Sequence, residues 1–225
     1  MARILIGVLI TLGLVAAEPD YADRLNDASS VLREIMETPD QAIPQELLDR
    51  RSECAVIVPG VKKAAFIIGA RYGKGYISCR NKNGMGWTAP GTVRIEGGSF
   101  GFQIGGSETD VVLLVMNRRG EERLLKSKFT LGAGAAVAAG PVGRSTKAAT
   151  DLLLTAQILS WSRSRGVFAG VSLQGATLRQ DLDDNRELYG RRLTNRETVQ
   201  RNTPVPEAAK EFISLLNKYS SRRTS

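Results

Sequence analysis

Apolar residues near the start of the chain recur with a helical period. Between residues 20 and 38 they fall three or four positions apart, at Leu25, Ala28, Val31, Leu32, Ile35 and Met36. This spacing places them on one face of an α-helix, which Pro39 then ends. A second, shorter helix is predicted over residues 44–51, with Pro44 in its first turn.

The middle of the chain has the pattern of strands separated by glycine-rich turns. Strands are predicted where apolar runs or alternating residues occur, at residues 55–58, 64–70, 75–79, 93–96, 99–104 and 111–116. The glycine in Tyr72-Gly73-Lys74 predicts a hairpin turn between the second and third of these runs. Residues 111–116 are apolar throughout, as in a strand that is buried on both faces.

The last part of the chain returns to helices after two late strands. We expect strands at residues 152–160 and 167–173, and helical segments at 121–127, 181–189 and 206–219. With 23 glycines, this order predicts an α+β fold. Its core is a mainly antiparallel, glycine-rich, strongly bent or barrel-like sheet flanked by N-terminal and C-terminal helices. One domain is expected at 18–225, comprising helices at 20–51, a strand-rich core at 54–175 and a helical tail at 178–225.

The first 17 residues have the pattern of a secretory signal peptide. Arg3 precedes 14 uncharged, mostly apolar residues, fewer than the about 20 that a spanning helix needs. Val15 and Ala17 supply small residues before a cleavage site. We therefore expect export to the periplasm or the exterior, with an uncleaved N-terminal anchor as the alternative. In an oxidising compartment Cys54 and Cys79 form either a disulfide or two separate buried thiols.

The composition excludes several kinds of chemistry. Histidine is absent and only two cysteines occur, so neither a histidine-based hydrolase nor a conventional zinc site can be built. Residues 97–101 match G-x-S-x-G, but without a histidine base they predict a glycine-bent strand. The acidic residues Asp181, Asp183 and Asp184 lack the spacing of a calcium loop and favour a solvated turn. We expect no enzyme activity, no cofactor and no metal.

The charges are segregated along the chain, whose formal net charge is +8. Residues 18–53 carry ten acidic and four basic side chains, whereas residues 54–95 carry no acidic side chain. This acid-free block predicts a surface that attracts phosphates or anionic lipid, through Lys62, Lys63, Arg71, Lys74, Arg80 and Lys82. The alternative is that these cations pair with the acidic N-terminal helices. Tyr72 and Trp87 lie near these cations in the sequence. They are predicted to be apolar membrane contacts, and the alternative is that they are core residues.

Several segments of the chain resemble the SYLF-domain family. They are residues 56–66, 86–90, 97–106, 109–117, 139–144, 160–171 and 185–190, in the order expected for the family. The resemblance implies a lipid-binding module without catalytic residues. In this family, eukaryotic members bind phosphoinositides, fungal members bind actin filaments and bacterial members are exported. The resemblance therefore implies lipid binding and export for this chain. Some eukaryotic members contact membranes through a basic N-terminal segment, but here residues 20–37 are acidic.

The sequence therefore predicts a non-enzymatic, exported domain that binds anionic phospholipid or phosphoinositide-like head groups through a basic face. Four such cations contribute about 4 kcal/mol, which corresponds to roughly millimolar binding. Attachment to the membrane is thus expected to be peripheral and reversible, with apolar insertion or several copies adding to it. The alternative is an envelope scaffold or protein-binding module with an acidic protein partner. Nucleic acid is not an expected partner of an exported protein.

Overall fold

The computed structural model describes residues 20–38, 42–66, 68–100, 105–132, 137–142, 156–164, 167–170, 173 and 175–221. The predicted signal peptide and parts of the strands predicted at 99–104, 152–160 and 167–173 lie outside these residues. Among the helices of the described residues, none has both the length and the apolar character that crossing a bilayer requires.

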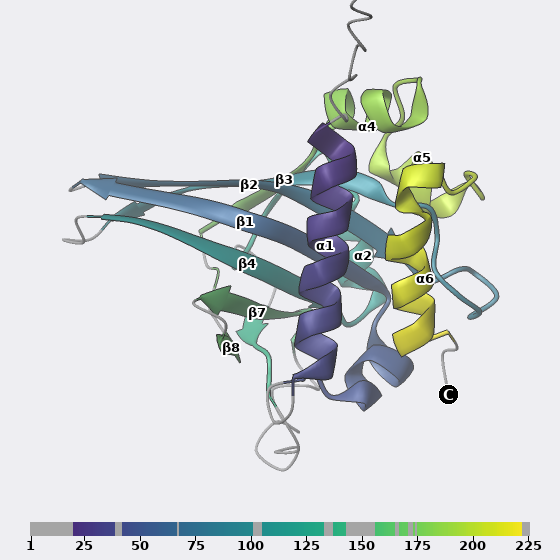
Figure 1. Cartoon of the computed structure of the whole chain (residues 1–225), viewed down its shortest axis with the longest axis horizontal. Helices are drawn as coiled ribbons and strands as arrows, with labels where there is room; N and C mark the ends of the chain where they lie inside the picture. The colour runs from purple at the N-terminus through teal and green to yellow at the C-terminus, as the bar shows by residue number, and fades with distance from the viewer. Residues whose placement is uncertain are drawn as a thin grey trace, which may run out of the picture.

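One curled sheet of nine strands organises the described chain (Figure 1). The strands are β1 (Cys54–Phe66), β2 (Ile68–Cys79), β3 (Gly91–Phe100), β4 (Gly105–Val115), β5 (Lys128–Thr130), β6 (Val137–Ala139), β7 (Ile158–Ser164), β8 (Val167–Gly170) and β9 (Thr177–Gln180). Their order is β5-β9-β3-β2-β1-β4-β7-β6, with β8 also paired to β7. Among the strand pairs that the described residues form, only β6–β7 is parallel.

Helices from the two ends of the described chain, and one from its middle, pack on this sheet. They are α1 (Asp20–Glu37), the π-helix η1 (Leu47–Arg51), α2 (Arg118–Leu124), α4 (Leu182–Tyr189), α5 (Asn195–Gln200), the 3-10 helix η2 (Glu207–Ala209) and α6 (Lys210–Tyr219). In Figure 1, α1 crosses the strands with α6 beside it. The α+β prediction, with a bent antiparallel sheet flanked by helices, is confirmed, and the sheet forms a half-barrel.

The two faces of the sheet bury separate apolar cores, because successive side chains of a strand point in opposite directions. On β1, Ala55 and Ile57 pack in the core that includes α1 and α6. Val56 and Val58 pack in the second core, on the other face. The unbroken apolar run at the start of β1 is explained by this burial on both sides.

A bulge in β1 bends the sheet midway along its longest strands. The pairing of β1 with β4 shifts between Val58 and Val61, where Gly60 adopts a positive φ of 57°. The partner strand β2 has glycine opposite this bend, since a Cβ on Gly75 would lie 2.1 Å from the Ile57 carbonyl oxygen. Glycine at this position therefore allows two backbones to approach closely.

Three sequence predictions of secondary structure are wrong. The single strand predicted at 64–70 is divided between β1 and β2, which are antiparallel and pair Ala64 with Ala70. Tyr72-Gly73-Lys74 lies within β2 and is not a turn, because its glycine serves the close approach to β1 and the strand pairs continuously with β3. The predicted helical tail at 178–225 contains most of β9, whose four residues complete the sheet beside β3. Four residues with alternating polar and apolar character are too few for the sequence to distinguish this strand from a helix start.

Candidate functional site

Four strands extend past the helices as a projecting arm, which is the leftward extension of β1, β2, β3 and β4 in Figure 1. We define the arm as residues 62–66, 68–72, 96–100 and 105–108. Within it, Lys62 pairs with both Tyr72 and Glu108, and Ala65 pairs with Gly69 and Gly105. The order of strands across the arm is therefore β3-β2-β1-β4.

Three of the six predicted head-group cations lie on this arm. Lys63 and Arg71 are directly opposed cross-strand partners, and Lys62 opposes Tyr72 one position closer to the helices. Strand alternation places Lys62 and Tyr72 on the face toward α1, and Lys63 and Arg71 on the other face. The Tyr72 side chain is 48% exposed. Cations therefore occur on both faces of the arm instead of on one basic face.

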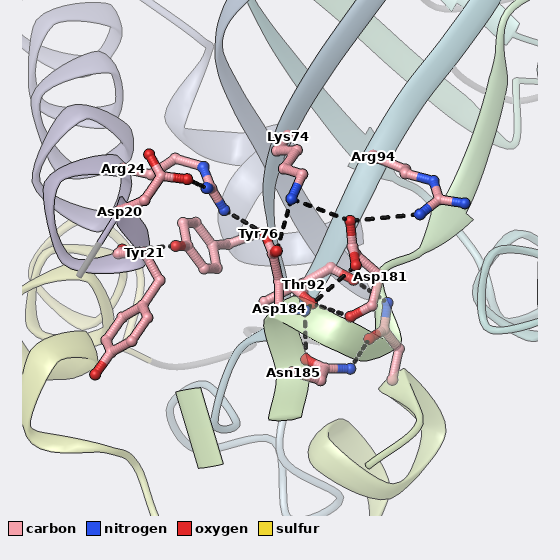
Figure 2. A network of polar contacts seen from close by, with 11 residues as sticks. Asp20, Tyr21, Arg24, Lys74, Tyr76, Thr92, Arg94, Asp181, Asp184 and Asn185 are labelled. Carbon is pink, nitrogen blue, oxygen red and sulfur yellow. Dashed lines mark hydrogen bonds and ion pairs between the residues drawn. The ribbon is translucent and has the colours of Figure 1, made fainter. Parts of the chain in front are cut away.

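Lys74 belongs to a different environment, a network of ion pairs between α1, the sheet and α4 (Figure 2). Its ammonium nitrogen lies 2.6 Å from Asp184 and 3.6 Å from Asp181. Asp184 also accepts a hydrogen bond from Arg24 of α1. The side chains of Arg24 and Asp184 are only 11% and 6% exposed. Assigning Lys74 to a head-group site is therefore a misplacement, because carboxylates already neutralise it.

This network continues across the sheet and anchors the start of α4. Asp181 caps α4 through its side chain and lies 3.6 Å from the Arg94 guanidinium. The Thr92 hydroxyl donates to the Asp181 carbonyl, and the Thr92 N–H donates to Asn185. The buried acids at 181 and 184 are thus not a solvated turn, as the sequence suggested, because Arg24, Lys74 and Arg94 surround them.

The charges around Lys74 also affect its ionisation. Partial burial lowers the pKa of Lys74, but the hydrogen bond and negative charge of Asp184 outweigh this and raise it above the usual 10.5. Burial likewise raises the pKa of the neighbouring Tyr76 phenol above its ordinary value. The Tyr76 hydroxyl donates to the Tyr21 carbonyl of α1 at 2.7 Å. Both groups therefore retain their protons more strongly in the folded protein.

Arg80 and Trp87 are core residues, so their predicted roles in head-group and membrane contact are wrong. They are 8% and 4% exposed, and the guanidinium of Arg80 lies 4.1 Å from the Trp87 ring centre. Both side chains donate hydrogen bonds to the Ser220 carbonyl after α6, and Arg80 also donates to Leu48. These contacts fasten the end of α6 to the sheet, which requires that both side chains be inside.

Lys82 is exposed but lies at the opposite end of β2 from the arm. Eleven residue steps separate Ile68 from Cys79 at the two ends of this strand, a span of roughly 35 Å. Lys82 follows in a loop that lines a 530 Å³ pocket with residues 199–202. The structure therefore places three of the six predicted cations on the arm, Lys74 beside two carboxylates, Arg80 in the core and Lys82 in this distant loop.

A groove of 680 Å³ opens between α1 and the strands at the base of the arm. It is polar, and its lining includes Asp23, Asp27, Glu108, Lys62 and Tyr72. Arg163 of β7 crosses this region to contact both Asp110 and Glu34. The groove is therefore a mixed-charge surface, not the apolar cavity that a buried lipid chain requires.

The two cysteines that the sequence left unassigned form a disulfide between Cys54 and Cys79. They are paired residues at the start of β1 and the end of β2, so the bond closes the end of this hairpin opposite the arm. The Glu121 carboxylate lies within 4.8 Å of both sulfur atoms. Because both thiols are oxidised, this group does not provide thiolate ligands for a metal.

Together these contacts define an α+β module from which the strand arm projects. We call the helix-covered remainder of the module the base, and it is held together by the ion pairs around Asp184 and by the disulfide. The family described as "Ysc84: Las17-binding protein actin regulator" matches residues 96–219. The chain belongs to this family, the SYLF-domain family that its motifs resemble. The family resemblance predicted from the sequence is confirmed.

Curated relatives agree with this assignment. SH3 domain-containing YSC84-like protein 1 of Rattus norvegicus and of Homo sapiens are each 32% identical over 201 residues, covering 87% of this chain. Protein YSC84 of Saccharomyces cerevisiae is 33% identical over 180 residues, or 79% of this chain. The chain spans 58% of the length of the two mammalian relatives and 38% of the yeast protein. None of these names describes an enzymatic activity.

Sequence reasoning missed the residues that neutralise Lys74. Asp184 and Lys74 are 110 residues apart, and no local pattern joins them. The signal that was available is the helix cap, since Asp181 precedes a helical segment and an acid there suits the helix dipole. A cap predicts where α4 begins, but it does not predict which cations pack against it.

Proposed function

We propose that this protein is a non-enzymatic module that binds anionic membrane surfaces peripherally through the arm. The observation that carries the proposal is the position of Lys62, Lys63, Arg71 and the exposed Tyr72 on strands that extend past the helices. Glu96 and Glu108 lie level with Lys62 on the neighbouring strands, and farther out the arm strands carry Lys63 and Arg71 and no carboxylate. A projecting element of this charge reaches a flat surface before the helix-covered base does.

The strength of this contact is modest. A lysine or arginine near an anionic leaflet contributes about 1 kcal/mol, so Lys62, Lys63 and Arg71 together contribute at most about 3 kcal/mol, and less where a carboxylate such as Glu108 lies opposite. Free energies of this size give weak binding that salt reverses, because surface charges are screened within about 10 Å at 0.1 M salt. Reversible, peripheral attachment follows. The head groups that fit are those with exposed phosphate, including phosphatidylglycerol and phosphoinositides.

Sedimentation with vesicles tests this function. The protein is expected to sediment with phosphatidylcholine vesicles that contain phosphatidylglycerol, less so at high salt, and not with phosphatidylcholine alone. The double variant Lys63→Ala/Arg71→Ala is expected to weaken partitioning by about 30-fold, from about 2 kcal/mol of lost attraction. Lys82→Ala/Lys126→Ala removes the same charge from exposed positions away from the arm and serves as the matched control. Equal recovery on neutral and acidic vesicles, or equal losses in the two double variants, contradicts the proposal.

We also propose that the protein works outside the cytoplasm. The Cys54–Cys79 disulfide supports this location, since such bonds persist in oxidising compartments and are rare in the cytosol. The apolar segment at residues 4–17 provides the export signal in this proposal. Mass measurement of the protein recovered from its native compartment tests it: the expected mature chain begins near Glu18 with both cysteines oxidised, and an intact chain with free thiols contradicts it.

A second candidate function is binding to an acidic protein, such as an envelope partner. The family description supports it, because it names a protein, Las17, as the binding partner of a family member. In this case the same arm cations contact carboxylates on the partner surface. The double variant then loses capture of an acidic protein that is recovered in the absence of vesicles, while wild-type sedimentation is the same with neutral and acidic vesicles.

A further inference from the structure

A polar pocket lies at the end of the module opposite the arm. Its volume is 530 Å³, and it is lined by the loop that follows β2 and by residues 199–202, at the end of α5 and just after it. In Figure 1, α5 lies to the right of the sheet, whereas the arm extends to the left. Small-molecule sites have volumes of about 300–1,000 Å³. The pocket therefore has the size of a ligand site that is separate from the arm.

The lining of this pocket combines positive charge with carboxamide groups. Lys82 comes from the loop, and Arg201 comes from the end of α5. Most of the remaining lining consists of the carboxamide side chains of Asn81, Asn83, Gln200 and Asn202. Among the described residues, the lining includes neither an acidic nor an aromatic side chain. A carboxamide both donates and accepts hydrogen bonds, so the pocket offers both kinds of partner beside its cations.

Hydrogen bonds within the loop hold one wall of the pocket in place. The Asn81 side chain donates to the Met85 carbonyl at 2.7 Å, and the Met85 N–H donates to the Asn83 side-chain oxygen at 3.0 Å. Gly86 adopts a positive φ of 69°, and its N–H donates to the Ser221 carbonyl at 2.6 Å. The loop is thus tied to itself and to the segment after α6. A ligand therefore meets a formed wall, and its binding does not require the loop to become ordered.

Contacts of α5 with the base fix the opposite wall. Val199 is buried, and the Gln200 side chain donates to the Glu121 carboxylate of α2 at 3.1 Å. Two residues further on, Asn202 adopts a positive φ of 56°. Glycine adopts this conformation without steric cost. The substitution Asn202→Gly therefore removes a carboxamide from the pocket without straining the backbone.

Both cations of the pocket retain capacity for a ligand. Lys82 is exposed, and the described contacts include no ion pair of its ammonium group. Arg201 donates from one terminal nitrogen to Glu197 at 2.9 Å, which leaves its other N–H groups available. A guanidinium presents its N–H groups as a fork that fits phosphate oxygens, and a lysine adds a point charge. Because Glu197 neutralises part of this charge, a single anionic group matches what remains.

We infer that this pocket binds a phosphorylated sugar or another phosphorylated polyol from the aqueous phase. The phosphate complements Lys82 and Arg201, and the hydroxyl groups pair with carboxamides, since both donate and accept hydrogen bonds. A nucleotide fits less well, because the lining offers no aromatic ring on which its base would stack. The pocket lies beyond the end of β2 that is roughly 35 Å from the arm. A protein attached to a membrane by its arm therefore keeps this pocket in solution, and the two binding activities are separable.

Titration calorimetry of the full chain with glucose 6-phosphate and glycerol 3-phosphate tests this site. At least one of these probes is expected to bind at least tenfold more tightly than glucose or inorganic phosphate, because neither of these uses both the cations and the carboxamides. Lys82→Ala/Arg201→Ala is expected to weaken binding at least tenfold, since hydrogen bonds to charged groups are lost. Lys126→Ala/Lys128→Ala removes the same charge from exposed positions outside the lining and is the matched control.

Two further measurements locate the bound probe. Amide NMR shifts are expected to change at residues 81–88 and 199–202, and Asn202→Gly is expected to weaken binding about fivefold without lowering the melting temperature. Circular dichroism identifies the variants that keep the fold, and either Asn202→Gly or the cation variant suffices.

Several results contradict the site. They are no binding of either probe to the wild-type protein, inorganic phosphate binding as tightly as both probes, equal losses in the two double variants, or a tetraglutamate peptide that binds more tightly than both probes. The last result assigns the pocket to a protein partner. Vesicle sedimentation of Lys82→Ala/Arg201→Ala is expected to equal that of the wild-type protein, so failure of the pocket site leaves the membrane proposal standing.

Discussion

Lys74 and Arg71 lie three residues apart on the same strand, but their surroundings differ. Lys74 contacts buried carboxylates, whereas Arg71 lies on the projecting arm. At the base, Lys74 contacts two carboxylates that are almost fully buried, and helices cover the strand. On the arm, Arg71 opposes Lys63 on strands that extend beyond the helices. A cation in a basic segment therefore stabilises the fold or faces outward according to the elements that pack on it, and residue type alone does not distinguish the two.

The largest expected effect on stability comes from the base. Asp184→Asn removes the carboxylate that Arg24 and Lys74 share, which leaves a largely buried arginine and a partly buried lysine with a reduced counter-charge. We expect a loss of about 3–5 kcal/mol in the free energy of unfolding, measured by urea denaturation. Asp183→Asn changes an exposed residue one position earlier and is the matched control. Similar stability for the two variants contradicts the described network.

The disulfide closes the base end of the β1–β2 hairpin and gives the next effect. Its loop spans a sequence separation of 25, for which chain entropy predicts about 3 kcal/mol of stabilisation. Cys54→Ala/Cys79→Ala is expected to lose about this amount in thermal or urea unfolding. Reducing agent added to the wild-type protein provides an independent comparison, and it has no effect on the double variant. If the double variant is as stable as the wild-type protein, and reducing agent does not destabilise the wild-type protein, the bond is absent.

The dependence of stability on alkaline pH gives a third prediction, which concerns Tyr76. Its pKa and that of Lys74 are both raised in the folded protein, so the folded state binds these protons more tightly than the unfolded state. Stability from this source is fully present below about pH 10 and is lost as the pH rises further. Tyr76→Phe is expected to cost about 1 kcal/mol at neutral pH, from the lost hydrogen bond to Tyr21, and to flatten the alkaline decline. An unchanged alkaline slope contradicts the role of Tyr76.

The smallest effect on stability is expected at the arm. Arg71→Ala is predicted to change the free energy of unfolding by less than about 0.5 kcal/mol, because no buried carboxylate among the described contacts depends on it. Its partitioning onto acidic vesicles falls about fivefold. Lys74→Ala is the informative comparison, and the opposite result is expected. It loses about 2 kcal/mol of stability, because Asp184 keeps Arg24 but loses its other cation, and its partitioning changes little. If both variants behave alike, the distinction between arm and base is wrong.

Much of the architecture was accessible from local pattern. The three- and four-residue spacing predicted α1, and apolar runs located the central strands, because helix and strand periodicities are properties of neighbouring residues. Glycine was harder to interpret. At Gly73 and Gly75 it permits close packing of two strands, which the sequence cannot distinguish from a turn.

The sequence by itself determined the α+β class, the family and the concentration of positive charge in residues 54–95. Only the tertiary structure decided that Lys74 meets Asp184, that Arg80 and Trp87 hold the end of α6, and that Lys63 and Arg71 lie on the arm. The physical reason is that charge composition is additive along a chain, whereas burial and pairing depend on segments more than 100 residues apart in the sequence.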